Sequence, residues 1–165
     1  MQMGLPVSIR ASAAVARGEC YEAVLALAQL PRLHGVVQEA AEGFAVRLQF
    51  SQARQQWRLD GQLNARLALQ CRRCDALYEH LLEADIALRL VRTEAEERAL
   101  LADCEPYWVE QDEVHLVELV EDEILLALPM LPRCSACEES VQAQPRAAQN
   151  TEARRESPFA VLKKM

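Results

Sequence analysis

Two stretches of alternating apolar and polar residues flank a pair of cysteines, Cys71 and Cys74, and they constrain the fold more than any other feature. Side chains alternate between the two faces of a β-strand, so a period of two indicates a strand with one buried face. The sequence therefore predicts a β-hairpin that carries the cysteines at its tip, with a first strand that is long or bent near Gly61. The predicted buried face consists of Trp57, Leu59, Leu63, Ala65, Leu67 and Leu69 in the first strand, and of Tyr78, His80, Leu82, Ala84, Ile86, Leu88 and Leu90 in the second.

Two further segments precede the hairpin. Residues 44–50 alternate in the same way and predict another half-buried strand. Residues 19–30 place Val24, Leu27 and Ala28 at helical spacing, and a proline follows this segment. We therefore expect a short helix there, docked on the sheet.

Two helices are predicted after the hairpin. Residues 93–102 begin with Thr93 and have Glu96 three positions later, which is the spacing of a capping box. Residues 113–128 show a regular helical stripe and end before two prolines. We expect Val117, Val120, Ile124 and Leu128 to form the buried stripe of this helix and Glu118, Glu121 and Asp122 to face water.

These elements predict an α+β fold, with an antiparallel β-sheet that carries helices on one face. We expect residues 1–137 to form one domain with a cysteine-bearing hairpin. Residues 138–165 are expected to form a flexible C-terminal tail that ends in a short apolar motif, because the stretch up to that motif shows no sustained apolar period.

Four cysteines form two C-x-x-C pairs, Cys71 with Cys74 and Cys134 with Cys137. Four thiolates suit a tetrahedral zinc ion, and such a closed set would leave no position open for catalysis. The separation between the pairs exceeds the roughly 15–20 residues of a compact zinc ribbon. We therefore expect a structural zinc site, with thiol redox chemistry or unligated cysteines as the alternatives. Cys20 and Cys104 have no partner at ligand spacing and are read as structural residues.

The charge of the chain argues against bulk electrostatic binding of nucleic acid. The formal net charge is −7, and residues 71–137 contain 16 acidic but only 6 basic residues. An acidic surface repels phosphate, so any RNA contact should be local. No secretory leader or membrane-length apolar run is evident, so we expect a cytoplasmic protein without a membrane partner.

No motif for catalysis or for a small-molecule substrate is evident. The three histidines form no metal or nucleophile motif, and Glu121, Asp122 and Glu123 are consecutive, so they fan around a helix rather than pair on one face. The chain also lacks a glycine-rich phosphate loop. We therefore expect a protein that is not an enzyme.

Three segments resemble the YceD family of bacterial proteins, which also has relatives in plant organelles. They are LQCRRC after an alternating strand, VELVEDEILLALPMLPRC, and the terminal SPFAVLKKM, in matching order and spacing from Trp57 to the carboxyl terminus. The resemblance implies a role in accumulation of large-subunit (23S) ribosomal RNA and in ribosome assembly. It supports Cys71 and Cys74 more strongly than Cys134 and Cys137, because some relatives look as if they alter the second pair.

The expected partners are large-subunit rRNA, a ribosomal protein or an assembly factor. Arg72 and Arg73 on the hairpin tip are candidate contacts with phosphate or a base edge, or they form a solvated turn. Pro158 and Phe159 belong to an apolar motif that is expected to dock on a partner groove, or else to pack on the same molecule. A thiol redox protein or sensor that uses Cys71 and Cys74 is the alternative function.

Overall fold

The computed structural model describes residues 4–100 and 104–142. The chain divides into two compact units, Met1–Arg133 and Cys134–Met165. In chain order the elements are β1 (Ser8–Arg10), α1 (Ala11–Arg17), β2 (Cys20–Leu25), the 3-10 turns Leu27–Gln29 and Pro31–Leu33, β3 (Phe44–Ala53), β4 (Gln56–Gln70), β5 (Leu77–Val91), α2 (Glu94–Arg98), β6 (Glu105–Trp108), β7 (Glu113–His115), α3 (Leu116–Ala127) and α4 (Ser135–Gln142).

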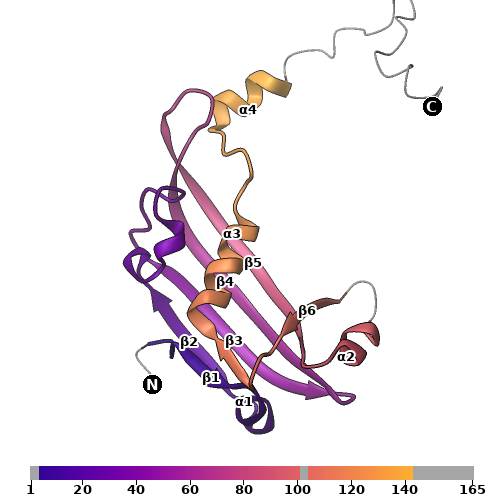
Figure 1. The fold of residues 1–165 in the computed structure, drawn as a ribbon. Helices are drawn as coiled ribbons and strands as arrows, with labels where there is room; N and C mark the ends of the chain where they lie inside the picture. Colours follow the sequence, from indigo (N-terminus) through magenta and orange to yellow (C-terminus); the bar gives the residue numbers. More distant parts are fainter. Residues whose placement is uncertain (1–3, 101–103, 143–165) are drawn as a thin grey trace, which may run out of the picture. The chain divides into compact units, whose positions relative to one another are not determined.

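A five-stranded sheet in the order β2-β3-β4-β5-β6 forms the body of the first unit. All neighbours are antiparallel except β6, which pairs with the last four residues of β5 in parallel. Figure 1 shows α3 lying across one face of this sheet. Strands β1 and β7 form a separate two-stranded sheet. The predicted α+β class is confirmed.

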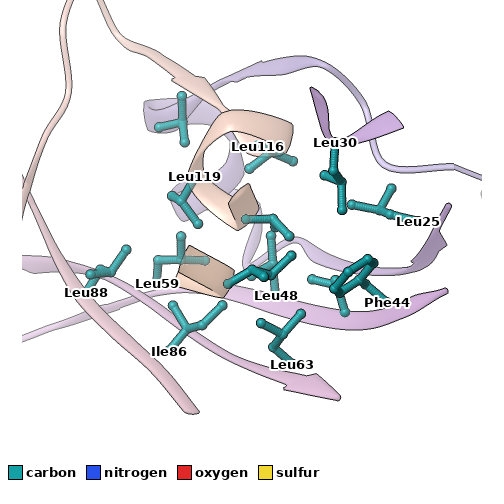
Figure 2. Close-up of a cluster of buried hydrophobic side chains, with 14 of the residues drawn as sticks. Leu25, Leu30, Phe44, Leu48, Leu59, Leu63, Ile86, Leu88, Leu116 and Leu119 are labelled. Carbon is teal, nitrogen blue, oxygen red and sulfur yellow. The ribbon is translucent and has the colours of Figure 1, made fainter. Parts of the chain in front are cut away.

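The alternating residues behave as the sequence predicts. In β4 and β5, Leu59 lies opposite Leu88, and Ala65 lies opposite Leu82. Their side chains are buried on the face that α3 covers, as Figure 2 shows for the cluster around Leu116 and Leu119. Full burial of each large aliphatic side chain contributes about 1.5–3 kcal/mol, so this layer supplies most of the driving force for folding.

Residues 19–30 form a strand and not the expected helix. Residues 20–25 pair with β3 in a six-residue antiparallel ladder, followed by a 3-10 turn. Within this strand Tyr21, Ala23 and Leu25 point to the more buried face, which is also a period of two. The segment satisfies both periods over its short length, and the unpaired edge of β3 decides between them.

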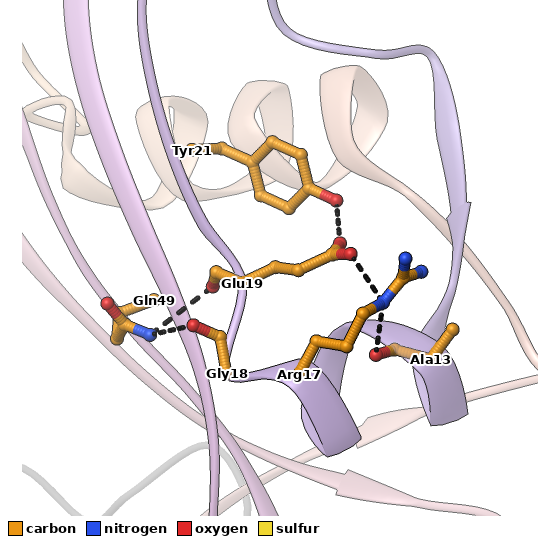
Figure 3. Close-up of polar contacts among 6 residues, drawn as sticks. All are labelled: Ala13, Arg17, Gly18, Glu19, Tyr21 and Gln49. Carbon is orange, nitrogen blue, oxygen red and sulfur yellow. Dashed lines mark hydrogen bonds and ion pairs between the residues drawn. The ribbon is translucent and has the colours of Figure 1, made fainter.

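The end of α1 connects to β2 through a small polar network (Figure 3). Glu19 accepts hydrogen bonds from the Tyr21 hydroxyl and pairs with the Arg17 guanidinium, and the Gln49 amide donates to the carbonyls of Gly18 and Glu19. Gly18 adopts a left-handed conformation that ends the helix. Burial and the neighbouring Glu19 raise the pKa of Tyr21 to about 12. The hydroxyl therefore stays protonated and donates throughout the neutral range.

The helix predicted after residue 93 is confirmed over Glu94–Arg98, with the Thr93 side chain accepting a hydrogen bond from the Glu96 backbone. The last predicted helix is confirmed over residues 116–127, whereas its expected first residues form β7. No helix in the described ranges is long and apolar enough to span a membrane.

Glu121 is buried, which contradicts its expected exposure. Only 2% of its surface is accessible, and its carboxylate accepts a hydrogen bond of 2.9 Å from the backbone nitrogen of Arg32. The neighbouring Asp122 pairs with the Arg32 side chain and is exposed, as expected. The carboxylate of Glu121 thus holds the 3-10 turn Pro31–Leu33 on α3.

Replacing Glu121 with alanine is expected to lower the free energy of unfolding by about 1–3 kcal/mol, because the Arg32 amide loses the acceptor of a partly buried hydrogen bond. Asp122→Ala is the matched control, since it removes only an exposed ion pair worth about 0–1 kcal/mol. Urea denaturation of both variants provides the measurement. Equal losses at the two positions would contradict the assigned role of Glu121.

Candidate metal centre

The first cysteine pair occupies the tip of the β4–β5 hairpin, as predicted. The backbone nitrogen of Cys71 donates to the Ala76 carbonyl at 2.9 Å, and Asp75 donates to the Cys71 carbonyl at 3.0 Å. Asp75 adopts a positive φ of 59°, a conformation that aspartate tolerates better than most residues. These bonds fold the tip into a tight turn in which Cys71 is buried and Cys74 is exposed.

The chain after α3 returns to this turn. The backbone nitrogen of Arg72 donates a hydrogen bond of 2.9 Å to the carbonyl of Pro132. Because each residue spans at most about 3.6 Å, a bond at Pro132 keeps the following Cys134 within reach of the hairpin tip. Sequence spacing alone does not show this return, since β5, α2, β6 and α3 separate the two segments.

The second cysteine pair opens α4. The backbone nitrogens of Cys137 and Glu138 both donate to the Cys134 carbonyl at 3.0 Å, which places Cys134 at the start of the helix. A helix N-terminus favours negative charge. Thiolates bind metal ions and also attack disulfides, so this position is compatible with both functions considered for the pair.

The structure brings together the four cysteines that the sequence selects. One sulfur each from Cys71, Cys74, Cys134 and Cys137 lies within 4.8 Å of all the others. Thiolates bound to tetrahedral zinc at about 2.3 Å lie about 3.8 Å from one another. The cluster is therefore compatible with a metal site.

The hairpin tip carries exposed charges of both signs, Arg72, Arg73 and Asp75. Arg72 and Arg73 occupy the two positions between the first pair of cysteines and are exposed. A different surface, made by α3 and β6, is acidic. Burial raises the pKa of Glu123 above its usual value, and the nearby carboxylates of Glu105 and Asp122 add to the effect. The two arginines are therefore exposed at the tip of a chain with a negative total charge, next to the carboxylate of Asp75.

An apolar surface near the first cysteine pair was not predicted. Leu126, Met130 and Leu131 are 72%, 98% and 65% exposed. A small cavity of about 110 Å³ lies beside them, with Val36, Leu69, Gln70, Leu128 and Met130 among its lining residues. The sequence feature that indicates this exposed apolar surface is the run PMLP after α3. Prolines on both sides prevent Met130 and Leu131 from continuing a buried helical stripe. Pro158 and Phe159 lie outside the described residues.

Comparison with known proteins identifies relatives of this chain. A profile of the family described as "Large ribosomal RNA subunit accumulation protein YceD" matches residues 59–165, which include both cysteine pairs. A protein from Haemophilus influenzae, named "Large ribosomal RNA subunit accumulation protein YceD", is 34% identical over 108 residues. The alignment covers 63% of this chain and 62% of that relative, so less than two thirds of the relative is spanned. No solved structure matches the chain.

Proposed function

The chain belongs to the YceD family, and we propose that it supports accumulation of large-subunit (23S) ribosomal RNA and assembly of the large ribosomal subunit. The match of the family profile over residues 59–165 carries this proposal. The protein acts in the cytoplasm as a binding protein without catalysis. Its partner is large-subunit rRNA, a ribosomal protein or an assembly factor.

We further propose that Cys71, Cys74, Cys134 and Cys137 hold a structural zinc ion. The mutual distances of the four sulfurs and the hydrogen bond between Arg72 and Pro132 support the site. With four protein ligands, zinc has no position left for substrate or water, so its role is to fix the shape of the tip. The domain, residues 1–137 in this proposal, would then include all four ligands.

Arg72 and Arg73 are proposed to contact phosphate or a base edge of the rRNA. They sit between two metal ligands, so a bound ion would hold their backbone rigidly while their side chains remain exposed. Guanidinium groups match phosphate oxygens in a bidentate geometry. Pro158 and Phe159, in the tail 138–165, are proposed to bind a partner groove as an apolar motif.

Deletion of the gene is expected to lower the amount of 23S rRNA relative to 16S rRNA and to reduce free and assembled large subunits in sucrose gradients. The wild-type gene should restore both. A double variant, Arg72→Ala with Arg73→Ala, should fail to restore them if these arginines contact the rRNA or its proteins. Arg47→Ala with Arg98→Ala is the matched control, because it removes two exposed arginines of β3 and α2. A deletion strain with normal rRNA and normal subunit ratios would contradict the proposed function.

A further inference from the structure

Most of the outer edge of β5 has no neighbouring strand. β5 extends over Leu77–Val91, but β6 pairs only with Leu88–Val91. Within the described part of the chain, residues 77–87 form no strand pairing or bridge on that side. Every second residue of such an edge directs a backbone N–H and C=O outward, where another strand can bind them.

Three carboxylates are the only usual protection against strand pairing that the sequence of this edge carries. Proteins guard exposed strand edges with charged side chains, above all lysine, and with proline or a bulge, whereas residues 77–87 contain no lysine, proline or glycine. On the face away from α3, Leu77 and Leu81 are 64% and 58% exposed. A partner strand would cover such side chains. The neighbouring residues 88–91 already accept β6 in this way.

The charge of the edge indicates what kind of strand it can accept. Glu79, Glu83 and Asp85 alternate with the exposed leucines on the same face of β5. No ion pair involves these three carboxylates among the residues that the structure describes. Arg66 lies on the neighbouring strand β4, opposite Leu81. An incoming strand with lysine or arginine at alternate positions would therefore meet unpaired negative charge.

We propose that the edge of β5 over residues 77–87 binds an extended, lysine- or arginine-rich segment of a protein partner by strand addition. The partner's identity rests on the proposed function, since a protein that assembles on rRNA needs basic residues to neutralise phosphate. RNA itself is repelled by the carboxylates. A second copy of β5 would place like charges near one another across the two edges, which destabilises a strand pair.

A short synthetic peptide of alternating lysine and valine is the first probe. Binding should slow hydrogen exchange of the outward amides of residues 77–87 by about tenfold or more in two-dimensional NMR spectra. The same peptide with N-methyl groups at alternate residues cannot add as a strand and should give no protection. Equal protection by both peptides, or none by either, would overturn strand addition.

Charge-reversed variants of the full-length protein test the role of the carboxylates. Glu79→Lys with Glu83→Lys should abolish the protection. Glu39→Lys with Glu42→Lys, which makes the same change in net charge at two exposed residues before β3, should retain it. If both variants keep the protection, the proposed charge recognition is wrong.

Cells that carry the Glu79→Lys, Glu83→Lys protein should accumulate less 23S rRNA. Normal accumulation there, beside a defect in the deletion strain, would refute this inference and leave the proposed function standing.

Site-specific photocrosslinking in growing cells identifies the occupant. A crosslinker at Leu81 should capture a lysine- or arginine-rich segment of a protein, and one at Val24, which is 64% exposed on the opposite edge strand β2, should not. Capture of RNA, of residues 143–165 of the same chain, or of a second copy would overturn the proposal. A Leu81 crosslink pattern identical to that of Val24 would overturn it too.

Discussion

Replacing Cys74 with serine is expected to reduce the zinc content of the purified protein from one ion per chain to near zero. The same change should lower the free energy of unfolding by about 4 kcal/mol or more, because loss of a metal ion is among the few single changes with so large an effect. Cys74 is exposed, so serine leaves no cavity in the core. Inductively coupled plasma mass spectrometry and urea denaturation measure the two quantities.

Cys20→Ser is the matched control for this prediction. Cys20 is also exposed but lies on the edge strand β2 outside the four-cysteine cluster, so its replacement should change neither zinc content nor stability. A strong zinc chelator should mimic Cys74→Ser when added to the wild type. A wild-type protein that folds without metal, with a Cys74→Ser variant of unchanged stability but lost thiol–disulfide exchange, would instead support the redox alternative.

Local sequence patterns were sufficient to predict the central hairpin. Residues 57–69 and 78–90 keep a period of two over long stretches, with Ala68, Leu81 and Ala87 as apolar exceptions on the other face, and a period that long is incompatible with a helix. The prediction for the shorter segment 19–30 was wrong. Val24, Leu27 and Ala28 fit a helix, whereas the actual strand depends on pairing with β3, whose paired residues lie 19–29 positions later in the sequence. Strand pairing is a tertiary interaction, and short segments follow it rather than their own pattern.

The sequence was sufficient to predict which residues form the candidate metal centre, but not where in the fold they meet. The two C-x-x-C spacings select Cys71, Cys74, Cys134 and Cys137 directly. Their approach depends on the backbone bond from Arg72 to Pro132, which leaves no trace in side-chain chemistry. The burial of Glu121 could not be predicted either, because its hydrogen-bond partner is a backbone amide 89 positions earlier. Interactions of the backbone over long distances are what single-sequence reasoning misses.

Replacing Gly61 with alanine is expected to destabilise the protein by about 1–3 kcal/mol, the usual range for overpacking a core. Intrinsic preference predicts the opposite sign, since glycine inside a strand costs roughly 0.5–1 kcal/mol relative to alanine. At this position, however, a Cβ atom would lie 2.5 Å from the backbone oxygen of Arg47 and 2.9 Å from a methyl carbon of Leu48. The oxygen belongs to the neighbouring strand β3 and can retreat only by disturbing the β3–β4 ladder.

The sign of the change at Gly61 therefore distinguishes strand propensity from close packing of the two strands. Gly4→Ala is the control, because a Cβ at Gly4 meets no atom within 4 Å. Guanidinium denaturation should give a lower midpoint for Gly61→Ala and an unchanged one for Gly4→Ala, with similar slopes for both. A Gly61→Ala protein as stable as the wild type would mean that β3 and β4 separate easily at the centre of the sheet. The long hairpin would then lack the rigid base that its cysteine-bearing tip needs in order to hold four ligands in place.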